Sequence, residues 1–258
     1  MKKNNWLSKL FVILVLLFNY LPIIVVVVYS FNASKYSNWA GFSLQWYEKL
    51  FRNSQILRSL NNSLILAFPS CGLSILIGTA GAVGMARSRF RTQGLLENVS
   101  MIPMMMPEII LGMAYLAFFS IIRIPFGILT LIIAHTTFCI PYIFFNVQSR
   151  LVELDPAYVE AARDLGASPT RAFYDVTLPL ITPAILSGAL LSFAMSMDDV
   201  VISFFVTGTT SNTLVYSMLK MGVTPEVNAL CTLMLLVVFG GIGLYYLLTT
   251  LLKKEKKQ

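Results

Sequence analysis

Two adjacent carboxylates stand inside an otherwise apolar run. The stretch SFAMSMDDVVISFFV, residues 192–206, carries Asp198 and Asp199 among apolar and small hydroxyl residues. An ionised aspartate at the centre of a bilayer costs about 3 kcal/mol on insertion scales, so such residues usually have a function. Neighbours on a helix point about 100° apart, so we expect one carboxylate to face a pathway while the other meets a neighbouring helix.

A third acid, Glu108, lies in another apolar run, after Pro103 and Pro107, which are spaced to bend that segment. Three intramembrane acids with hardly any intramembrane base suit a cationic solute. The rings of Tyr115 and Phe204 are candidates to attract ammonium groups, an interaction worth about 0.5 to 2 kcal/mol. The alternatives are lipid or helix packing for the rings, and a purely structural buried hydrogen bond for the acids.

The composition is that of a membrane protein. Of the 258 residues, 57% are hydrophobic and 12% charged, far from the balance of a soluble domain. Six mostly apolar stretches are each long enough to cross a hydrocarbon core of about 30 Å as a helix. The sequence therefore predicts an all-α integral membrane protein with six transmembrane helices, at 10–31, 60–86, 99–122, 127–147, 178–206 and 229–252.

Basic residues predict the orientation of these spans. With a cytoplasmic N-terminus, the cytoplasmic side collects 13 of the 19 Lys and Arg residues. Positive residues accumulate on the cytoplasmic side of membrane proteins, so both termini are expected there. The net charge of +7 thus reports topology, and no nucleic-acid partner is expected.

Motifs of soluble catalysts are missing from the chain. Gly-Lys never occurs, which excludes a Walker A loop, and no Gly-x-Ser-x-Gly elbow is present. The one histidine, His135, cannot form a His-x-x-x-His zinc pair. We therefore predict that the chain is not an enzyme and holds neither a catalytic residue, a metal nor a cofactor of its own.

The most polar stretch, SRLVELDPAYVEAARDLGASPTRAFYDVTLPL, separates the fourth and fifth spans. Asp155 before Pro156 is typical of a helix start, and Gly166 fits the left-handed residue that ends a helix. Ser-Pro at 168–169 repeats the start signal. The pattern predicts two short cytoplasmic helices that meet at the glycine, the second ending at about Asp175.

Small residues at the middle of the first short helix favour docking. Ala161 and Ala162 would let another surface approach the backbone, with polar contacts from Glu160 and Arg163 on either side. An ordinary solvated loop helix is the alternative, because Glu-Ala-Ala alone is common in helices.

The whole pattern of this loop resembles the EAA loop of ABC importer permeases, the membrane subunits of binding-protein-dependent importers. The matching residues are Glu160, Ala161, Ala162, Gly166, Leu178 and Pro179. Val176 stands where the family usually has isoleucine, which is a mild departure.

The resemblance implies a type I ABC importer permease fold. It implies a single transmembrane domain over 1–258, with a core at 60–252 and a cytoplasmic coupling loop at about 150–177. In the family this loop sits in a cleft of a separate ATPase subunit, so ATP and Mg are expected on that partner. The six matching residues are then the ATPase-coupling residues.

Further stretches are similar to the spermidine/putrescine permease subunits of this family. They are SFNASKYSNWAGFSLQWYEKL, MMMPEIILGM, SMDDVVISFFVTG and GVTPEVNAL. The similarity implies polyamine uptake across a bacterial cytoplasmic membrane, with a second homologous permease subunit, an ATPase dimer, an extracytoplasmic binding protein and membrane lipid as partners. Import of another small cation, an ion-driven secondary transporter and a purely structural subunit remain as alternatives.

Overall fold

A computed structural model describes residues 6–36, 38–87, 91–208, 213, 218 and 224–255. These residues form helices joined by turns and short extended segments. An isolated antiparallel bridge between Asn32 and Phe42 is present, and no β-strand occurs within the described ranges. The chain divides into two compact units, one made of Met1–Leu57 with Met218–Gln258 and the other of Arg58–Ser217.

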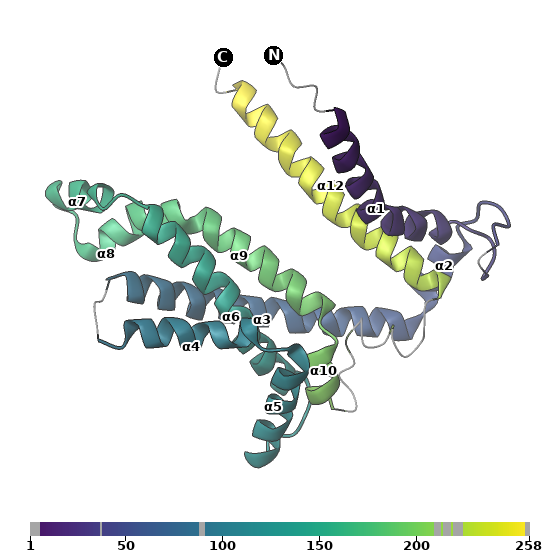
Figure 1. Ribbon diagram of the computed structural model, residues 1–258, viewed down its shortest axis with the longest axis horizontal. Helices are drawn as coiled ribbons and strands as arrows, with labels where there is room; N and C mark the ends of the chain where they lie inside the picture. The colour runs from purple at the N-terminus through teal and green to yellow at the C-terminus, as the bar shows by residue number, and fades with distance from the viewer. Residues whose placement is uncertain are drawn as a thin grey trace. The chain divides into compact units, whose positions relative to one another are not determined.

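The first unit is built on two long helices. Helix α1 (Trp6–Ser30) packs against α12 (Pro225–Glu255), and the short helix α2 (Gln45–Arg52) also contacts α12. Figure 1 shows α1 and α12 side by side and antiparallel. The start of α1 and the end of α12 therefore lie at the same end of this pair. The side of the membrane to which that end belongs stays a prediction.

The second unit contains the remaining helices and every predicted site residue. Its elements in chain order are α3 (Ser54–Arg87, which begins in the first unit), α4 (Gln93–Met105), α5 (Glu108–Ile121), α6 (Ile128–Glu153), α7 (Ala157–Asp164), α8 (Pro169–Ala172), a π-helical turn (Phe173–Thr177), α9 (Leu178–Asp198) and α10 (Val201–Val206).

Helix α6 lies at the centre of the second unit. It contacts α4, α9 and α10, and Figure 1 shows it beside α9. Its most apolar 18 residues are 56% buried, more than those of any other candidate span. A helix with apolar residues on all sides must find neighbours on several faces. Several α6 residues, among them Leu131, Ala134 and His135, are accordingly fully buried.

Close backbone approach and hydroxyl hydrogen bonds join α6 to its neighbours. A Cβ atom added to Gly188 of α9 would lie 2.9 Å from the Cα atom of Ile143 on α6, so only glycine fits there. On the other side, the hydroxyl of Ser74 on α3 donates to the Thr136 carbonyl of α6 at 2.9 Å. Small residues and interhelical hydrogen bonds are the usual means of helix association in membranes.

Each of the six predicted spans coincides with helix in the structure. Four helical segments are long and apolar enough to cross a membrane, and the bent pair α4 and α5 would make a fifth. The described apolar part of α12, Pro225–Gly240, is shorter than the length required of a span. A count of six transmembrane helices therefore stays a prediction.

Two of the predicted spans are interrupted in the structure. The span 99–122 is divided into α4 and α5, which meet at an angle of 105° next to Pro107, as the two prolines predicted. The span 178–206 is interrupted between α9 and α10, because Asp199 has an extended backbone (φ −62°, ψ 129°). Both interruptions lie beside the candidate acids.

Some residues used to predict the orientation lie outside the described part of the chain. They are Lys2, Lys3, Arg89, Lys220, Lys256 and Lys257.

The contact at Gly188 gives a stability prediction. Gly188→Ala places its methyl group against the Ile143 backbone, which cannot move away cheaply, and overpacking of this kind costs about 1–3 kcal/mol. We expect a lower thermal unfolding temperature for the purified variant. Gly84→Ala on α3 is the matched control, since its Cβ would meet nothing within 4 Å. Equal unfolding temperatures for the two variants would contradict this account of the α6–α9 contact.

Candidate functional site

The predicted docking loop forms a short helix with well-defined ends. The side chain of Asp155 accepts the Ala157 N–H at 2.9 Å at the start of α7. At the other end, Gly166 has φ +88° and donates to the Arg163 carbonyl at 2.9 Å, while Ala167 donates to Ala162 at 3.0 Å. This pair of bonds is a Schellman motif, in which glycine supplies the left-handed residue. The predicted role of Gly166 in ending the helix is confirmed.

Helix α7 presents a largely exposed surface. Ala161 is exposed and Ala162 is half-buried. Two large apolar side chains nearby are also open to solvent: Tyr158 is 58% exposed and Leu165 is 90% exposed. No residue of α7 is buried within this chain. Small residues flanked by exposed apolar ones form a surface on which another protein can pack closely.

The second loop helix continues into the fifth span. Ser168 accepts the Arg171 N–H with its side chain and Pro169 is the first helical residue, as predicted. The predicted end at about Asp175 is wrong, because the chain passes from α8 through the π-helical turn directly into α9. Leu178 and Pro179 thus stand at the start of α9, and the loop and the span share one helical path.

A pocket of about 460 Å³ lies beside α7, at the ends of α3 and α6. Glu160 and Arg163 line it from α7, and Arg87 lines it from the end of α3. The Arg87 guanidinium stands 4.9 Å from the ring centroid of Phe173 in the π-helical turn. A cation over an aromatic face is attracted by the ring quadrupole. This contact ties the end of α3 to the turn that leads into α9.

The two aspartates lie at the break between α9 and α10 and have different surroundings. Asp198 ends α9 and is exposed, whereas Asp199 is buried, with 7% of its surface accessible. Both oxygens of Asp199 accept backbone N–H groups: Oδ1 from Ile202 at 3.1 Å and Oδ2 from Ser203 at 2.9 Å. Asp199 therefore caps the start of α10, and the neighbouring carboxylates do not face one spot.

Glu108 occupies the other interruption. It is exposed in the first turn of α5, immediately after Pro107. A carboxylate is stabilised there by the positive end of the helix dipole. Glu108 lies within electrostatic range of both Asp198 and Asp199. The structure thus brings Glu108 into the same region as the Asp198–Asp199 pair, which begins 90 residues later in the sequence.

The two predicted aromatic residues have different environments. Tyr115 of α5 is half-buried, packs against the apolar core of the unit and stacks on Phe119 with centroids 6.1 Å apart. Phe204 of α10 is 62% exposed and meets Phe205 edge-on at 5.4 Å. Tyr115 therefore contributes to the core, while Phe204 presents a ring face at the surface of this chain.

Sequence analysis missed three polar residues around Asp199. His135 of α6 is fully buried and approaches Asp199 Oδ2 with Nε2 at 3.4 Å. Its Nδ1 lies 2.9 Å from the hydroxyl of Ser196, and Ser203 is also within 3.4 Å of Nε2. The available signal was that an ionisable residue in an apolar span usually has a partner there. Sequence analysis considered the histidine only as a zinc ligand.

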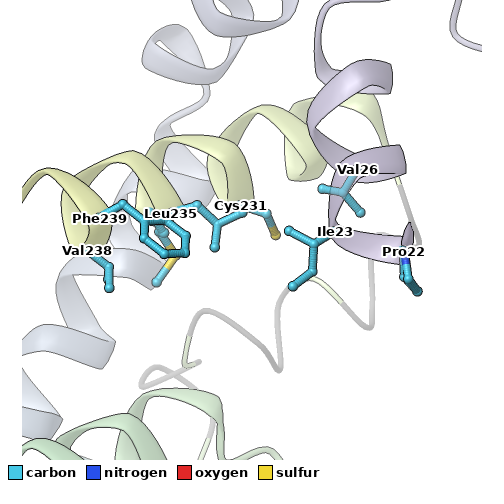
Figure 2. A pocket seen from close by; sticks show the side chains of 8 residues that line it. Pro22, Ile23, Val26, Cys231, Leu235, Val238 and Phe239 are labelled. Carbon is cyan, nitrogen blue, oxygen red and sulfur yellow. The ribbon is translucent and has the colours of Figure 1, made fainter. Parts of the chain in front are cut away.

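The first unit contains an apolar groove between α1 and α12 (Figure 2). Its lining residues are Pro22, Ile23, Val26, Cys231, Met234, Leu235, Val238 and Phe239. No charged side chain is among them, so the groove offers nothing to hold a cation. The candidate pathway residues all belong to the second unit.

The sequence of the chain matches a known protein family and named members of it. Residues 74–258 match the family described as "Binding-protein-dependent transport system inner membrane component". The chain is 40% identical over 248 residues to the spermidine/putrescine transport system permease protein PotC of Haemophilus influenzae, covering 95% of this chain and 96% of the relative. It is also 40% identical to the putrescine transport system permease protein PotI of Escherichia coli, over 93% of this chain and 89% of PotI.

Solved structures agree on the fold. A bacterial ABC transporter involved in the import of the acidic polysaccharide alginate matches with a TM-score of 0.70 at 12% identity, over 97% of this chain and 98% of the other. The MetNI methionine ABC transporter matches with a TM-score of 0.56 at 21% identity, over 74% and 92%. With the family match over residues 74–258 and a relative that is 40% identical along nearly the full length, the chain belongs to the inner membrane components of binding-protein-dependent transport systems and is a multi-pass transport permease.

Proposed function

We propose that this chain is a permease subunit of an ABC importer that carries polyamines such as spermidine and putrescine into the cell. The observation that carries the proposal is the 40% identity to a spermidine/putrescine permease over 95% of the chain. The three gathered acids agree with it in charge, because a polyamine carries several ammonium groups. Solutes with a negative charge would be repelled from this region.

The pathway runs past Asp198 and Glu108. Both are exposed and lie within electrostatic range of each other, whereas Asp199 is buried and engaged by backbone N–H groups. A flexible polycation fits separated carboxylates better than one tight pocket. A series of weak contacts along the pathway lets the solute both enter and leave, as conduction requires. Phe204 adds a ring face near the break, at which an ammonium group can rest.

The energy for transport comes from a partner subunit. ATP and Mg are bound by a dimer of ATPase subunits, against which α7 docks with Glu160, Ala161 and Ala162. A ligand shifts a conformational equilibrium only when it binds two states differently, so the docked loop must contact the open and closed ATPase dimer differently. The helical path from α8 through Leu178 and Pro179 transmits that difference to α9. A second homologous permease and an extracytoplasmic polyamine-binding protein complete the importer.

Uptake by the assembled importer in proteoliposomes tests the function. We expect radiolabelled spermidine to accumulate in the proteoliposomes only when ATP is present. Unlabelled putrescine should inhibit this uptake by competition, whereas lysine or a protonophore should leave it unchanged. Lysine uptake at a similar rate would instead indicate an importer of other small cations. Uptake that needs an ion gradient and no ATP would overturn the proposal in favour of a secondary transporter.

The glycine that ends α7 gives a prediction about coupling. Proline cannot adopt the positive φ of Gly166 and lacks the N–H that bonds to Arg163. Gly166→Pro should reduce ATP-dependent uptake at least tenfold and weaken copurification of the ATPase subunit. Gly166→Asn is the control, since asparagine tolerates the left-handed region, and it should retain most uptake. Normal uptake by the proline variant would remove the loop from coupling.

The exposed carboxylate of Asp198 at the break gives a prediction about the pathway. A hydrogen bond to a charged group contributes about 1.5–3 kcal/mol, so Asp198→Asn should raise the KM for spermidine about tenfold or more. Asp198→Glu keeps the charge and should remain close to the original KM. Initial uptake rates over a range of spermidine concentrations measure both. An unchanged KM in Asp198→Asn would exclude this residue from the pathway.

A further inference from the structure

We propose that His135 is a positioning residue that fixes the break between α9 and α10, so that Asp199 is held as an internal cap and, of the two aspartates, only Asp198 faces the pathway. The identity of the solute rests on the proposed function, but the fixing of the break does not. His135 contacts the chain on both sides of the interruption from a third helix, α6. The histidine itself is fully buried, with an exposed fraction of 0%.

The imidazole joins three parts of the chain with its two nitrogens. Nδ1 is 2.9 Å from the hydroxyl of Ser196, two residues before the end of α9. Nε2 is 3.4 Å from Asp199 Oδ2 at the break and 3.4 Å from the hydroxyl of Ser203 in α10. The ring therefore holds the last turn of α9, the break and the first turn of α10 against α6.

The contacts of the ring match the chemistry of its partners. A carboxylate only accepts hydrogen bonds, so the approach of Nε2 to Asp199 Oδ2 at 3.4 Å is favourable when Nε2 carries a hydrogen. Nδ1 and the Ser196 hydroxyl, 2.9 Å apart, form a hydrogen bond whose direction depends on the tautomer.

Asp199 is fully engaged by these contacts. Its Oδ1 accepts the Ile202 N–H, while its Oδ2 accepts the Ser203 N–H and faces His135. Peptide N–H groups at a helix break have no water to bond with inside a membrane, and the chain itself must supply acceptors. A buried carboxylate that lost its donors would be left uncompensated, which is costly. Asp199 therefore belongs to the scaffold of the break.

The orientation of Asp198 follows from the same contacts. Asp198 is the last residue of α9 and lies between Ser196 and Asp199, which both contact His135. With its two flanking points attached to α6, this stretch cannot rotate about the helix axis. The exposed carboxylate of Asp198 is thus held toward the pathway, within electrostatic range of Glu108.

Hydrogen exchange tests the break without reference to the solute. In the purified importer, His135→Leu should speed deuterium uptake at the amides of Val201–Val206 at least tenfold, because α10 loses its fixed cap. Glutamine can place an amide donor where Nε2 stands, so His135→Gln should restore most of the protection. Unchanged exchange of α10 in His135→Leu would overturn the proposal.

A double-mutant cycle on spermidine uptake tests the positioning role. His135→Leu should raise the KM at least tenfold in the original chain and should have no further effect on KM in an Asp198→Asn background, because the carboxylate that it orients is gone. Equal effects of His135→Leu in both backgrounds would show a merely structural role and overturn the proposal.

The two experiments separate this inference from the proposed function. If Asp198→Asn alone leaves the KM unchanged, the pathway through Asp198 fails, and His135 loses its positioning role with it. Faster exchange in α10 of His135→Leu would in that case still show that the histidine fixes the break. Hydrogen exchange therefore tests whether His135 fixes the break, and the uptake measurements test whether this contact orients Asp198 for transport.

Discussion

Hydrocarbon offers no hydrogen bonds to a peptide group, and this constraint decides where the chain can interrupt its helices. At the bend between α4 and α5, Pro107 has no N–H to satisfy, and the Met106 N–H bonds back to Ile102 at 3.0 Å. At the break after α9, the Asp199 carboxylate supplies the acceptors for Ile202 and Ser203. Each interruption is thus possible because a particular side chain removes or pairs the exposed donors.

The same interruptions bring the charged residues together. Glu108 is the first residue of α5, directly after the bend, and Asp198 is the last residue of α9, directly before the break. Glu108 lies at the start of α5, where the helix dipole favours a carboxylate, whereas Asp198 at the end of α9 gains no such stabilisation and is exposed. In a continuous span, these carboxylates would need partners on a neighbouring helix. Breaking the helices therefore lets carboxylates stand at helix ends within otherwise apolar stretches, as the proposed pathway requires.

The proposed coupling loop and the break lie at the two ends of one helical segment. From Pro169 to Asp198 the chain is helical over 30 residues, a length of about 45 Å at the rise of an α-helix. The Schellman motif at Gly166 and the Arg87–Phe173 contact lie at the loop end of this segment. At the other end, beside the break, His135 contacts Ser196. A displacement at α7 can therefore reach Asp198 through a single packed helix, whose contact with α6 at Gly188 guides it.

The sequence by itself determined the features that depend on local chemistry: helices at the six apolar stretches, the bend near Pro107, and the start and end signals of α7. These follow from hydropathy and from backbone preferences of proline and glycine, which act within a few residues. Only the tertiary structure decided that the fifth stretch breaks at Asp199, that the second loop helix runs on into α9, and which aspartate is buried. At the break, Asp199 contacts His135, 64 residues away in the chain, and a contact between distant segments leaves no periodic trace in either of them.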